Sequence, residues 1–237
     1  MRNLKAIYFK EMKSYFNSPM AYIFLVIFTV INGYFFTRTF FLFNQSDMRS
    51  LFNIVPLVYL FFIPAVTMSL IAREKNLGTM EVMSTLPLKD LDFVAGKFLA
   101  ALSLVLTGLA ITLVHFFTLT QVGTNIDYGA VFTGYLGLAL AGAVYSAVGT
   151  FASSLTDNQV VAFIIGIFIV LIFFLMDKML MFVPVYLTGI IQYLSVDYHL
   201  SNISRGVIDS RNLIYFGSVV GFFLFMTVRV LETRKWS

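Results

Sequence analysis

The chain has 237 residues, 59% of them hydrophobic and only 12% charged, whereas soluble domains carry about 25% charged residues. This composition excludes an ordinary soluble enzyme and indicates a polytopic membrane protein. The absence of cysteine excludes disulfides and thiolate metal sites. The net charge of +4 is concentrated at the termini and in one central loop, which fits membrane anchoring better than nucleic-acid binding. We therefore predict one all-α membrane domain over residues 1–237.

Residues 1–19 are predicted to form an amphipathic helix that lies along the membrane surface. Lysines point away from an apolar stripe with helical spacing, so the basic face can meet anionic lipid headgroups. Pro19 ends this helix before the first span. A cleaved signal peptide is the alternative, which we disfavour because no small-residue cleavage site follows and the apolar run is too long. The stripe comprises Leu4, Ile7, Tyr8, Met12, Tyr15 and Phe16.

Six apolar segments are predicted to cross the bilayer as helices. Arg38 lies near the end of the first, where its side chain can reach the interface. Pro56 and Pro64 should kink or locally unwind the second, which we ascribe to packing rather than to a gating hinge. His115, near the end of the third, is interpreted as an interfacial polar tip rather than a proton relay. The segments are 21–43, 52–71, 98–122, 131–153, 160–176 and 213–231.

The region 177–212 is predicted to lie on the outer side of the membrane without crossing it. Its apolar part, 179–194, would form a helix of about 24 Å, shorter than the ~30 Å hydrocarbon core. It also contains Pro184 and Gly189. We therefore predict a re-entrant or interfacial hairpin before the last helix, with a spanning helix as the alternative.

The basic residues predict the orientation of the chain. With six spans, both termini lie on the same side as the central loop, and this side holds 11 of the 16 Lys and Arg residues. The positive-inside rule makes that side cytoplasmic, so we predict a multi-pass protein of the bacterial inner membrane with both termini in the cytoplasm. A seventh span would place 10 of the 16 there, so length and proline, rather than charge, decide the count.

The predicted spans carry no ionisable residue at their middle, which argues against an ion-coupled carrier and against an intramembrane hydrolase. We also find no nucleophile–base pair, metal-ligand cluster or phosphate-binding glycine loop in the sequence. We therefore predict no catalytic residue, no metal site and no cofactor on this chain.

Small residues in the fourth and last predicted spans offer two surfaces for close helix packing. Gly217 and Gly221 form a GxxxG motif in the last span. Internal packing and dimerisation with a second chain are equal alternatives for both surfaces. The ridge in the fourth span comprises Gly142, Ser146, Gly149 and Ser153.

The central loop, 72–97, is the longest polar interruption between two apolar blocks, so it is the place where the membrane domain can meet a soluble partner. Gly78 permits a sharp change of direction. Met80, Met83 and Leu86 then recur at helical spacing and predict a short helix with one apolar face. Such a helix suits docking into a partner's groove, and resting on the lipid surface is the equal alternative.

The same loop resembles the signature of the permease subunits of ABC-2 type ABC transporters. In that family an acidic and basic pair is followed by G-T-x-E, then by Leu-Pro, and then by Gly-Lys at the entry to the next span. This chain has all four elements in that order, and the resemblance covers essentially its whole length. The elements are Glu74-Lys75, Gly78-Thr79-Met80-Glu81, Leu86-Pro87 and Gly96-Lys97.

Within this family the chain is most similar to the gliding-motility permease GldF and to the copper-enzyme maturation permeases. Segments 15–22, 64–68, 156–159 and 205–209 look like the pattern of that group. Arg73 departs from the acidic residue often found at its position.

The resemblance implies an export-type half-transporter in which two membrane chains, identical or related, each dock a separate cytoplasmic ABC ATPase. ATP and Mg would bind that ATPase and not this chain, which would not be an enzyme. The two glutamates of the loop would make polar contacts with the ATPase, while Gly78 and Pro87 would set the loop's shape. A non-transporting membrane scaffold that recruits a soluble partner is the alternative. The residues implied in ATPase coupling are Glu74, Gly78, Thr79, Glu81, Leu86 and Pro87.

Overall fold

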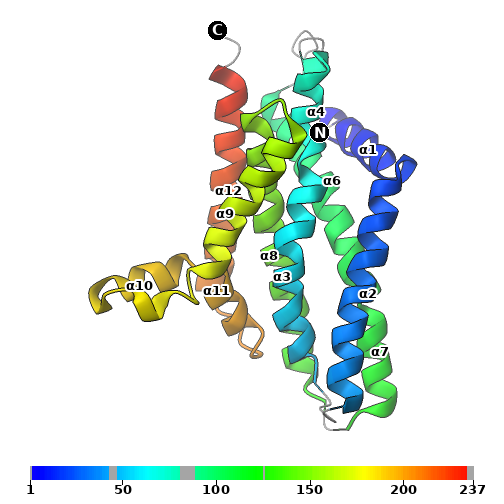
Figure 1. Cartoon of the computed structure of the whole chain (residues 1–237), viewed down its shortest axis with the longest axis vertical. Coiled ribbons are helices and arrows are strands. Elements are labelled where there is room, and N and C mark those ends of the chain that lie inside the picture. Colours follow the sequence, from blue (N-terminus) through cyan, green and yellow to red (C-terminus); the bar gives the residue numbers. More distant parts are fainter. Residues whose placement is uncertain (1, 43–46, 81–88, 125, 234–237) are drawn as a thin grey trace.

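The computed structural model of the chain describes residues 2–42, 47–80, 89–124 and 126–233, and these residues form helices joined by turns and short links. The all-α prediction is therefore confirmed for the described residues. Figure 1 shows a bundle of long helices with one short helix crossing its end and another projecting from its side. The helices are α1 Arg2–Asn17, α2 Pro19–Leu42, α3 Arg49–Thr67, α4 Ser69–Asn76, α6 Asp90–Ile111, α7 Leu113–Val122, α8 Tyr128–Leu155, α9 Gln159–Leu175, the 3-10 turn η1 Leu180–Phe182, α10 Val185–Leu194, α11 Val196–Ile203 and α12 Ser210–Thr233.

Among the described residues, five helical stretches are long and apolar enough to cross a membrane. Helix α9 has only 17 residues, or about 26 Å at 1.5 Å per residue, against a hydrocarbon core of about 30 Å. The count of six spans therefore stays a prediction. Helix α1 and the C-terminal end of α12 nevertheless lie at the same end of the bundle (Figure 1). The five stretches are Pro19–Phe41, Arg49–Asn76, Asp90–Val122, Tyr128–Leu155 and Ser210–Thr233.

Helix α8 is the central helix of the bundle and packs against α3, α6, α9, α11 and α12. Its small residues make this possible, because a Cβ on Gly142 would lie 3.1 Å from Val105 Cγ1 and a Cβ on Gly149 would lie 2.0 Å from Thr67 Oγ1. Ser146, between them, is fully buried. The structure thus places this ridge inside the chain, as the internal-packing alternative requires.

The GxxxG motif of α12 has the opposite environment. A Cβ added at Gly217 or at Gly221 would meet no described atom within 4 Å. These two glycines therefore face away from the rest of the bundle, and a dimer contact through them stays a prediction.

Helix α3 stays helical at both of its prolines, Pro56 and Pro64, and ends only at Thr67. Of the two predicted effects of the prolines, local unwinding is therefore wrong, and a kink stays a prediction. Pro64 packs close to α9, since a Cβ on Gly166 would lie 3.2 Å from its ring, and neighbouring helices of this kind stabilise a proline inside a span. The break comes at Met68, between α3 and α4.

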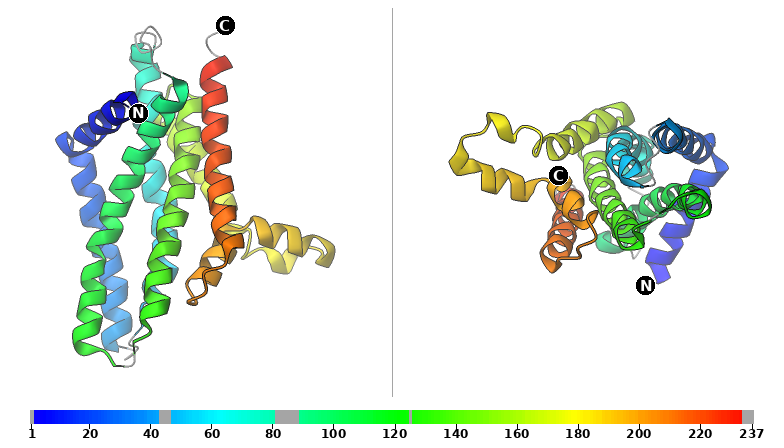
Figure 2. Two further views of the ribbon diagram at one scale, coloured as in Figure 1. Left: turned by 180° about the vertical axis from the view of Figure 1, so that it is seen from behind. Right: turned by 90° about the horizontal axis from the view of Figure 1, so that it is seen from below.

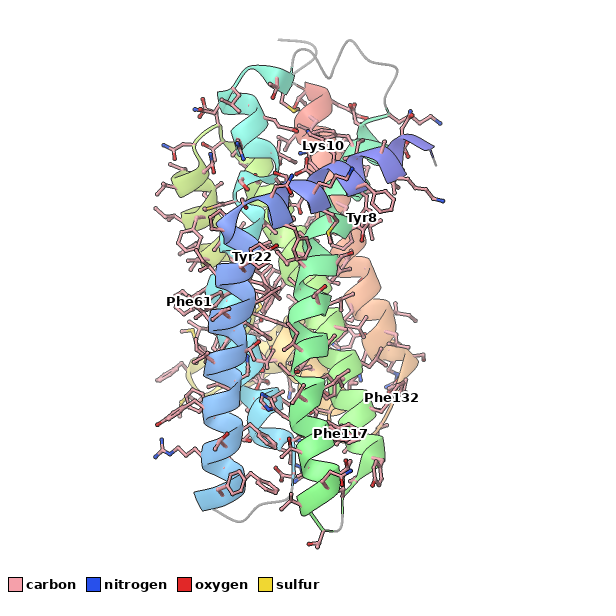
Figure 3. The ribbon with its side chains drawn as sticks, turned by 90° about the vertical axis from the view of Figure 1, so that its right-hand side faces the viewer. Tyr8, Lys10, Tyr22, Phe61, Phe117 and Phe132 are labelled. Atoms are coloured by element: carbon pink, nitrogen blue, oxygen red, sulfur yellow. The ribbon has the colours of Figure 1, made fainter. Side chains whose placement is uncertain are left out.

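Helix α1 crosses the end of the bundle at the level where apolar side chains give way to charged ones (Figure 3). Ile7 and Tyr15 are buried against the bundle, whereas Lys5 and Lys13 are exposed. The predicted amphipathic helix is confirmed, although Phe9 adds an exposed aromatic ring that the stripe did not include.

Between α9 and α12, the part that contains η1 and α10 projects sideways from the bundle as an arm, which Figures 1 and 2 show from three directions, whereas α11 packs against α8 and α12. Helix α10 has no buried residue, and with 10 and 8 residues neither α10 nor α11 is long enough to cross a bilayer. Re-entry of this arm into the membrane stays a prediction.

His199 fastens the arm to the bundle. Its buried ring stacks on Tyr215 with 3.9 Å between the ring centroids. Its Nδ1 lies 2.7 Å from Asn212 Oδ1 and its Nε2 lies 2.9 Å from the Tyr193 carbonyl oxygen. The Tyr215 hydroxyl donates to the Leu194 carbonyl at 2.6 Å. Helix α11 is thus held to α10 and α12 by ring and hydrogen-bond contacts between residues that are near neighbours in the sequence.

Candidate coupling site

The centre of the candidate site is Lys97, a cation that the bundle encloses almost completely. It lies two turns into α6, whose first turn carries Asp90 and Asp92, where acidic side chains favour the helix dipole. The Lys97 side chain is only 1% exposed, and its Nζ lies 2.8 Å from Glu11 Oε1 and 2.9 Å from Glu74 Oε2. A buried cation requires such partners because its desolvation alone costs several kcal/mol.

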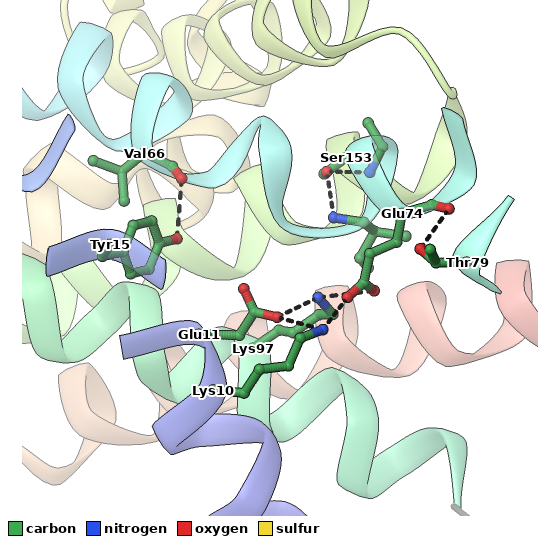
Figure 4. Close-up of polar contacts among 10 residues, drawn as sticks. Lys10, Glu11, Tyr15, Val66, Glu74, Thr79, Lys97 and Ser153 are labelled. Atoms are coloured by element: carbon green, nitrogen blue, oxygen red, sulfur yellow. Dashed lines mark hydrogen bonds and ion pairs between the residues drawn. The ribbon is translucent and has the colours of Figure 1, made fainter. Parts of the chain in front are cut away.

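Lys10 completes a quartet of alternating charges (Figure 4), with its Nζ 2.6 Å from Glu74 Oε1 and 3.5 Å from Glu11 Oε1. Two lysines thus meet two carboxylates, and the cluster has no net charge. Partial burial lowers the pKa of Lys10, but hydrogen bonding and attraction from Glu74, aided by Glu11, outweigh burial and raise this pKa. The contact between Lys97 and Glu74 Oε2 lacks hydrogen-bond alignment, so it acts through charge alone.

This charge quartet joins three elements, because Lys10 and Glu11 lie on α1, Glu74 on α4 and Lys97 on α6. Helix α4 contains the first residues of the central loop, 72–76, and α6 contains its last, 90–97, so the two helices flank the part of the loop between them. A displacement of that loop that moves α4 relative to α6 must therefore also move α1 or break an ion pair.

Close packing holds α1 on α6 beside the quartet. A Cβ added at Gly96 would lie 2.9 Å from Ile7 Cγ2 and 3.2 Å from the Leu4 carbonyl oxygen. The Tyr8 hydroxyl donates to Ser103 Oγ at 3.0 Å. On the α3 side, the buried Tyr15 hydroxyl donates to a carbonyl at the end of that helix, and burial raises the pKa of Tyr15 well above its ordinary value.

The break between α3 and α4 is held open by a side chain from α8. Ser153 Oγ accepts from the backbone N–H groups of Ile71 and Ala72, both at 3.0 Å, and donates to the Met68 carbonyl at 2.8 Å. A hydroxyl inserted into the i→i−4 ladder is a recognised cause of helix bending. Ser153 thus binds the backbone where α3 gives way to α4, the helix that carries Glu74.

The described start of the loop turns at Gly78, which has a φ of 70°. This left-handed conformation costs glycine little, so the predicted change of direction at Gly78 is confirmed. Thr79 Oγ1 donates back to the Glu74 carbonyl at 3.2 Å. Lys75 extends to the other side of α4, where its Nζ donates to the Ser154 carbonyl.

The structure brings together three of the six residues that the resemblance implied in coupling, namely Glu74, Gly78 and Thr79. Glu74 is only 9% exposed and its carboxylate pairs with Lys10 and Lys97, while its contact with an ATPase stays a prediction. Glu81, Leu86 and Pro87 lie outside the described residues, as does most of the predicted short helix.

Sequence reasoning missed Glu11, Lys10 and Lys97 as members of one cluster. The sequence does hold a signal for Glu11, which lies on the apolar stripe, midway between Ile7 and Tyr15 at helical spacing. A charge on a buried stripe requires a charged partner, but the sequence does not name it.

The arrangement connects three helices through ion pairs. Over the described ranges, no three His, Asp or Glu side chains gather where they would hold a metal ion. Ion pairs connect α1 to α4 and α6, the helices on either side of the loop. Ser153 of α8 binds the backbone between α3 and α4.

Comparison with known proteins agrees with this architecture. A family model described as "ABC-2 family transporter protein" matches residues 5–206, most of the chain. Among the curated proteins no sequence matches. The family match begins within α1 and runs through α11, and it ends before α12. The chain belongs to the ABC-2 family of transporter proteins.

Proposed function

We propose that this chain is the membrane-spanning permease subunit of an ATP-driven exporter and that its α1–α4–α6 corner receives force from a separate cytoplasmic ATPase. The observation that carries the proposal is the charge quartet, which ties α1 to both helices flanking the loop. An ATPase that grips the loop would pull α4 and α6, and the quartet would pass the displacement to α1 and on to α2.

A groove at the same end of the bundle supports a docking role for this face. It has a volume of about 490 Å³ and lies where the ends of α4, α8 and α12 meet. Lys75, Thr156 and Asp157 line it with charged and polar groups. A soluble partner seated on the loop would have this polar surface beside it.

The remaining features of the proposal follow from the family. Two permease chains, identical or related, would each bind one ATPase, and ATP and Mg would be held by that ATPase. The loop end of the bundle would face the cytoplasm of a bacterial inner membrane, with both termini on that side. A role in gliding motility rests on the resemblance of segments 15–22, 64–68, 156–159 and 205–209 alone.

The test begins with purification of the tagged chain from its native membrane in mild detergent, followed by mass-spectrometric identification of its companions. We expect an ABC ATPase whose hydrolysis is stimulated when both are reconstituted in vesicles. Glu81→Lys should leave the protein inserted and folded but abolish most of this stimulation, because charge reversal in the loop disrupts a polar contact. Asp177→Lys, the same reversal at the arm, should leave stimulation unchanged.

Two outcomes would count against the proposal. Undiminished stimulation in Glu81→Lys would remove the loop from the docking site. A companion that binds the loop without ATP-dependent transport would instead favour the membrane scaffold.

A further inference from the structure

A pocket of about 510 Å³ opens beside the charge quartet, between α1, α4 and the start of α2. Its volume falls within the range of about 300–1,000 Å³ that small-molecule sites occupy. Three cations, Lys10, Arg73 and Lys97, line it together with the carboxylates of Glu11 and Glu74. The quartet accounts for two of these cations and both carboxylates, so one positive charge, that of Arg73, remains in excess.

Arg73 is exposed, and within the described parts of the chain no carboxylate forms an ion pair with it. Its neighbours around the pocket include the hydroxyls of Ser14 and Ser69. A guanidinium with nearby hydroxyl donors is the combination that recognises a phosphate, because arginine offers a planar fork of N–H groups to phosphate oxygens.

The pocket wall also has apolar side chains, namely Leu70, Met20 and the exposed Leu77. A free inorganic anion does not need such apolar neighbours, but an acyl-glycerol backbone does. The pocket also lies at the level of α1, where the apolar flank of the bundle ends (Figure 3). That level corresponds to the headgroup region of a bilayer into which the bundle is inserted.

We propose that this pocket binds one anionic phospholipid, with its phosphodiester on Arg73 and its glycerol and upper acyl carbons against Leu70 and Met20. The bound lipid neutralises the excess charge at the corner and fills the space between α1 and α4. It thereby supports the separation between these helices that the quartet spans. The proposal stands independently of any ATPase, because it concerns the chain and the bilayer alone.

The test is native mass spectrometry of the whole chain in non-ionic detergent, titrated with phosphatidylglycerol. We expect one molecule to bind more tightly than the rest. Arg73→Gln should weaken this first binding about tenfold, the effect of losing one charge-assisted hydrogen-bonded contact, while Arg73→Lys should retain most of it. Lys13→Gln is the matched control, because Lys13 is an exposed cation of α1 outside this pocket, and it should change the first binding less than twofold.

Competition identifies the source of the phosphate. Phosphatidylcholine and inorganic phosphate should displace phosphatidylglycerol poorly, because the first lacks net charge and the second lacks the apolar part. Displacement by millimolar inorganic phosphate would overturn the lipid assignment in favour of a free-anion site. Equal weakening by Arg73→Gln and Lys13→Gln would overturn the pocket itself and leave only diffuse attraction between α1 and anionic lipid.

Discussion

Two short helices outside the bundle, α1 and α11, are fastened to it in different ways. Helix α1 uses charged groups whose partners lie far away in the sequence, 64 residues for Lys10 with Glu74 and 86 residues for Lys97 with Glu11. Helix α11 uses the ring of His199, whose polar partners lie only 6 and 13 residues away.

The difference indicates what each helix can transmit. Helix α1 is bound to two elements that are separated by the loop, so it responds to their relative position. Through its polar contacts α11 is bound to the segments immediately before and after it, and its apolar side packs on the central helix α8. The α1 corner is therefore suited to coupling, and the α11 contact to holding the arm in place.

The largest expected effect is at Lys97. Lys97→Met leaves the carboxylates of Glu11 and Glu74 in a nearly buried site with only the half-exposed Lys10 as partner, and breaking a buried pair costs about 3–5 kcal/mol. Lys10→Met removes a cation from the same carboxylates, yet it should cost at most about 1 kcal/mol because Lys10 is 51% exposed. Thermal unfolding of both variants in detergent measures the difference. Equal unfolding temperatures would contradict the assignment of Lys97 as the centre of the quartet.

Much of the fold could be predicted from the sequence, because its apolar segments are long. Long apolar segments in a chain with few charges have little alternative to spanning helices, and Gly78 supplied a turn that its positive φ confirms. The position of the α3–α4 break could not be predicted from the prolines, because Ser153 of another helix determines it.

The candidate site was predicted only in part, because its partners come from three distant segments. Glu74 was recognised through a motif, but its burial against Lys97 depends on how α1 crosses the bundle. Small-residue spacing was equally ambiguous, since Gly142 faces the core while Gly217 faces outward. A sequence gives the spacing of a helix face but not the direction in which that face points.

A second prediction addresses the contacts of His199 that hold α11. His199→Phe keeps a ring against Tyr215 but removes both polar contacts of the imidazole, leaving the Asn212 amide without that partner in a buried position. The expected cost is about 1–2 kcal/mol. Hydrogen exchange should increase over α10 and α11 and remain unchanged over α1 and α4. Increased exchange at α1 would show that the two fastenings are connected after all.

The smallest effect separates the packing of the two helices rather than their polar contacts. Gly96 lies under α1 and Gly137 under α11, and an added Cβ would meet Ile7 Cγ2 at 2.9 Å in the first case and Leu200 Cδ1 at 2.8 Å in the second. The two distances are nearly equal, but the neighbouring groups differ in how easily they can move away. The end of a leucine side chain can rotate away, whereas Ile7 is β-branched and the Leu4 carbonyl behind it is backbone.

Both substitutions by alanine gain up to about 1 kcal/mol of helix propensity, so their difference isolates the contact. Gly137→Ala should be neutral or slightly stabilising. Gly96→Ala should lose about 1 kcal/mol overall, because overpacking of about 1–3 kcal/mol exceeds the gain. Unfolding temperatures of the two variants measure this difference, with Gly217→Ala, which meets no described neighbour, as the reference for propensity alone. If Gly96→Ala matched that reference, α1 would be able to lift from α6 at little cost, and the quartet alone would hold it.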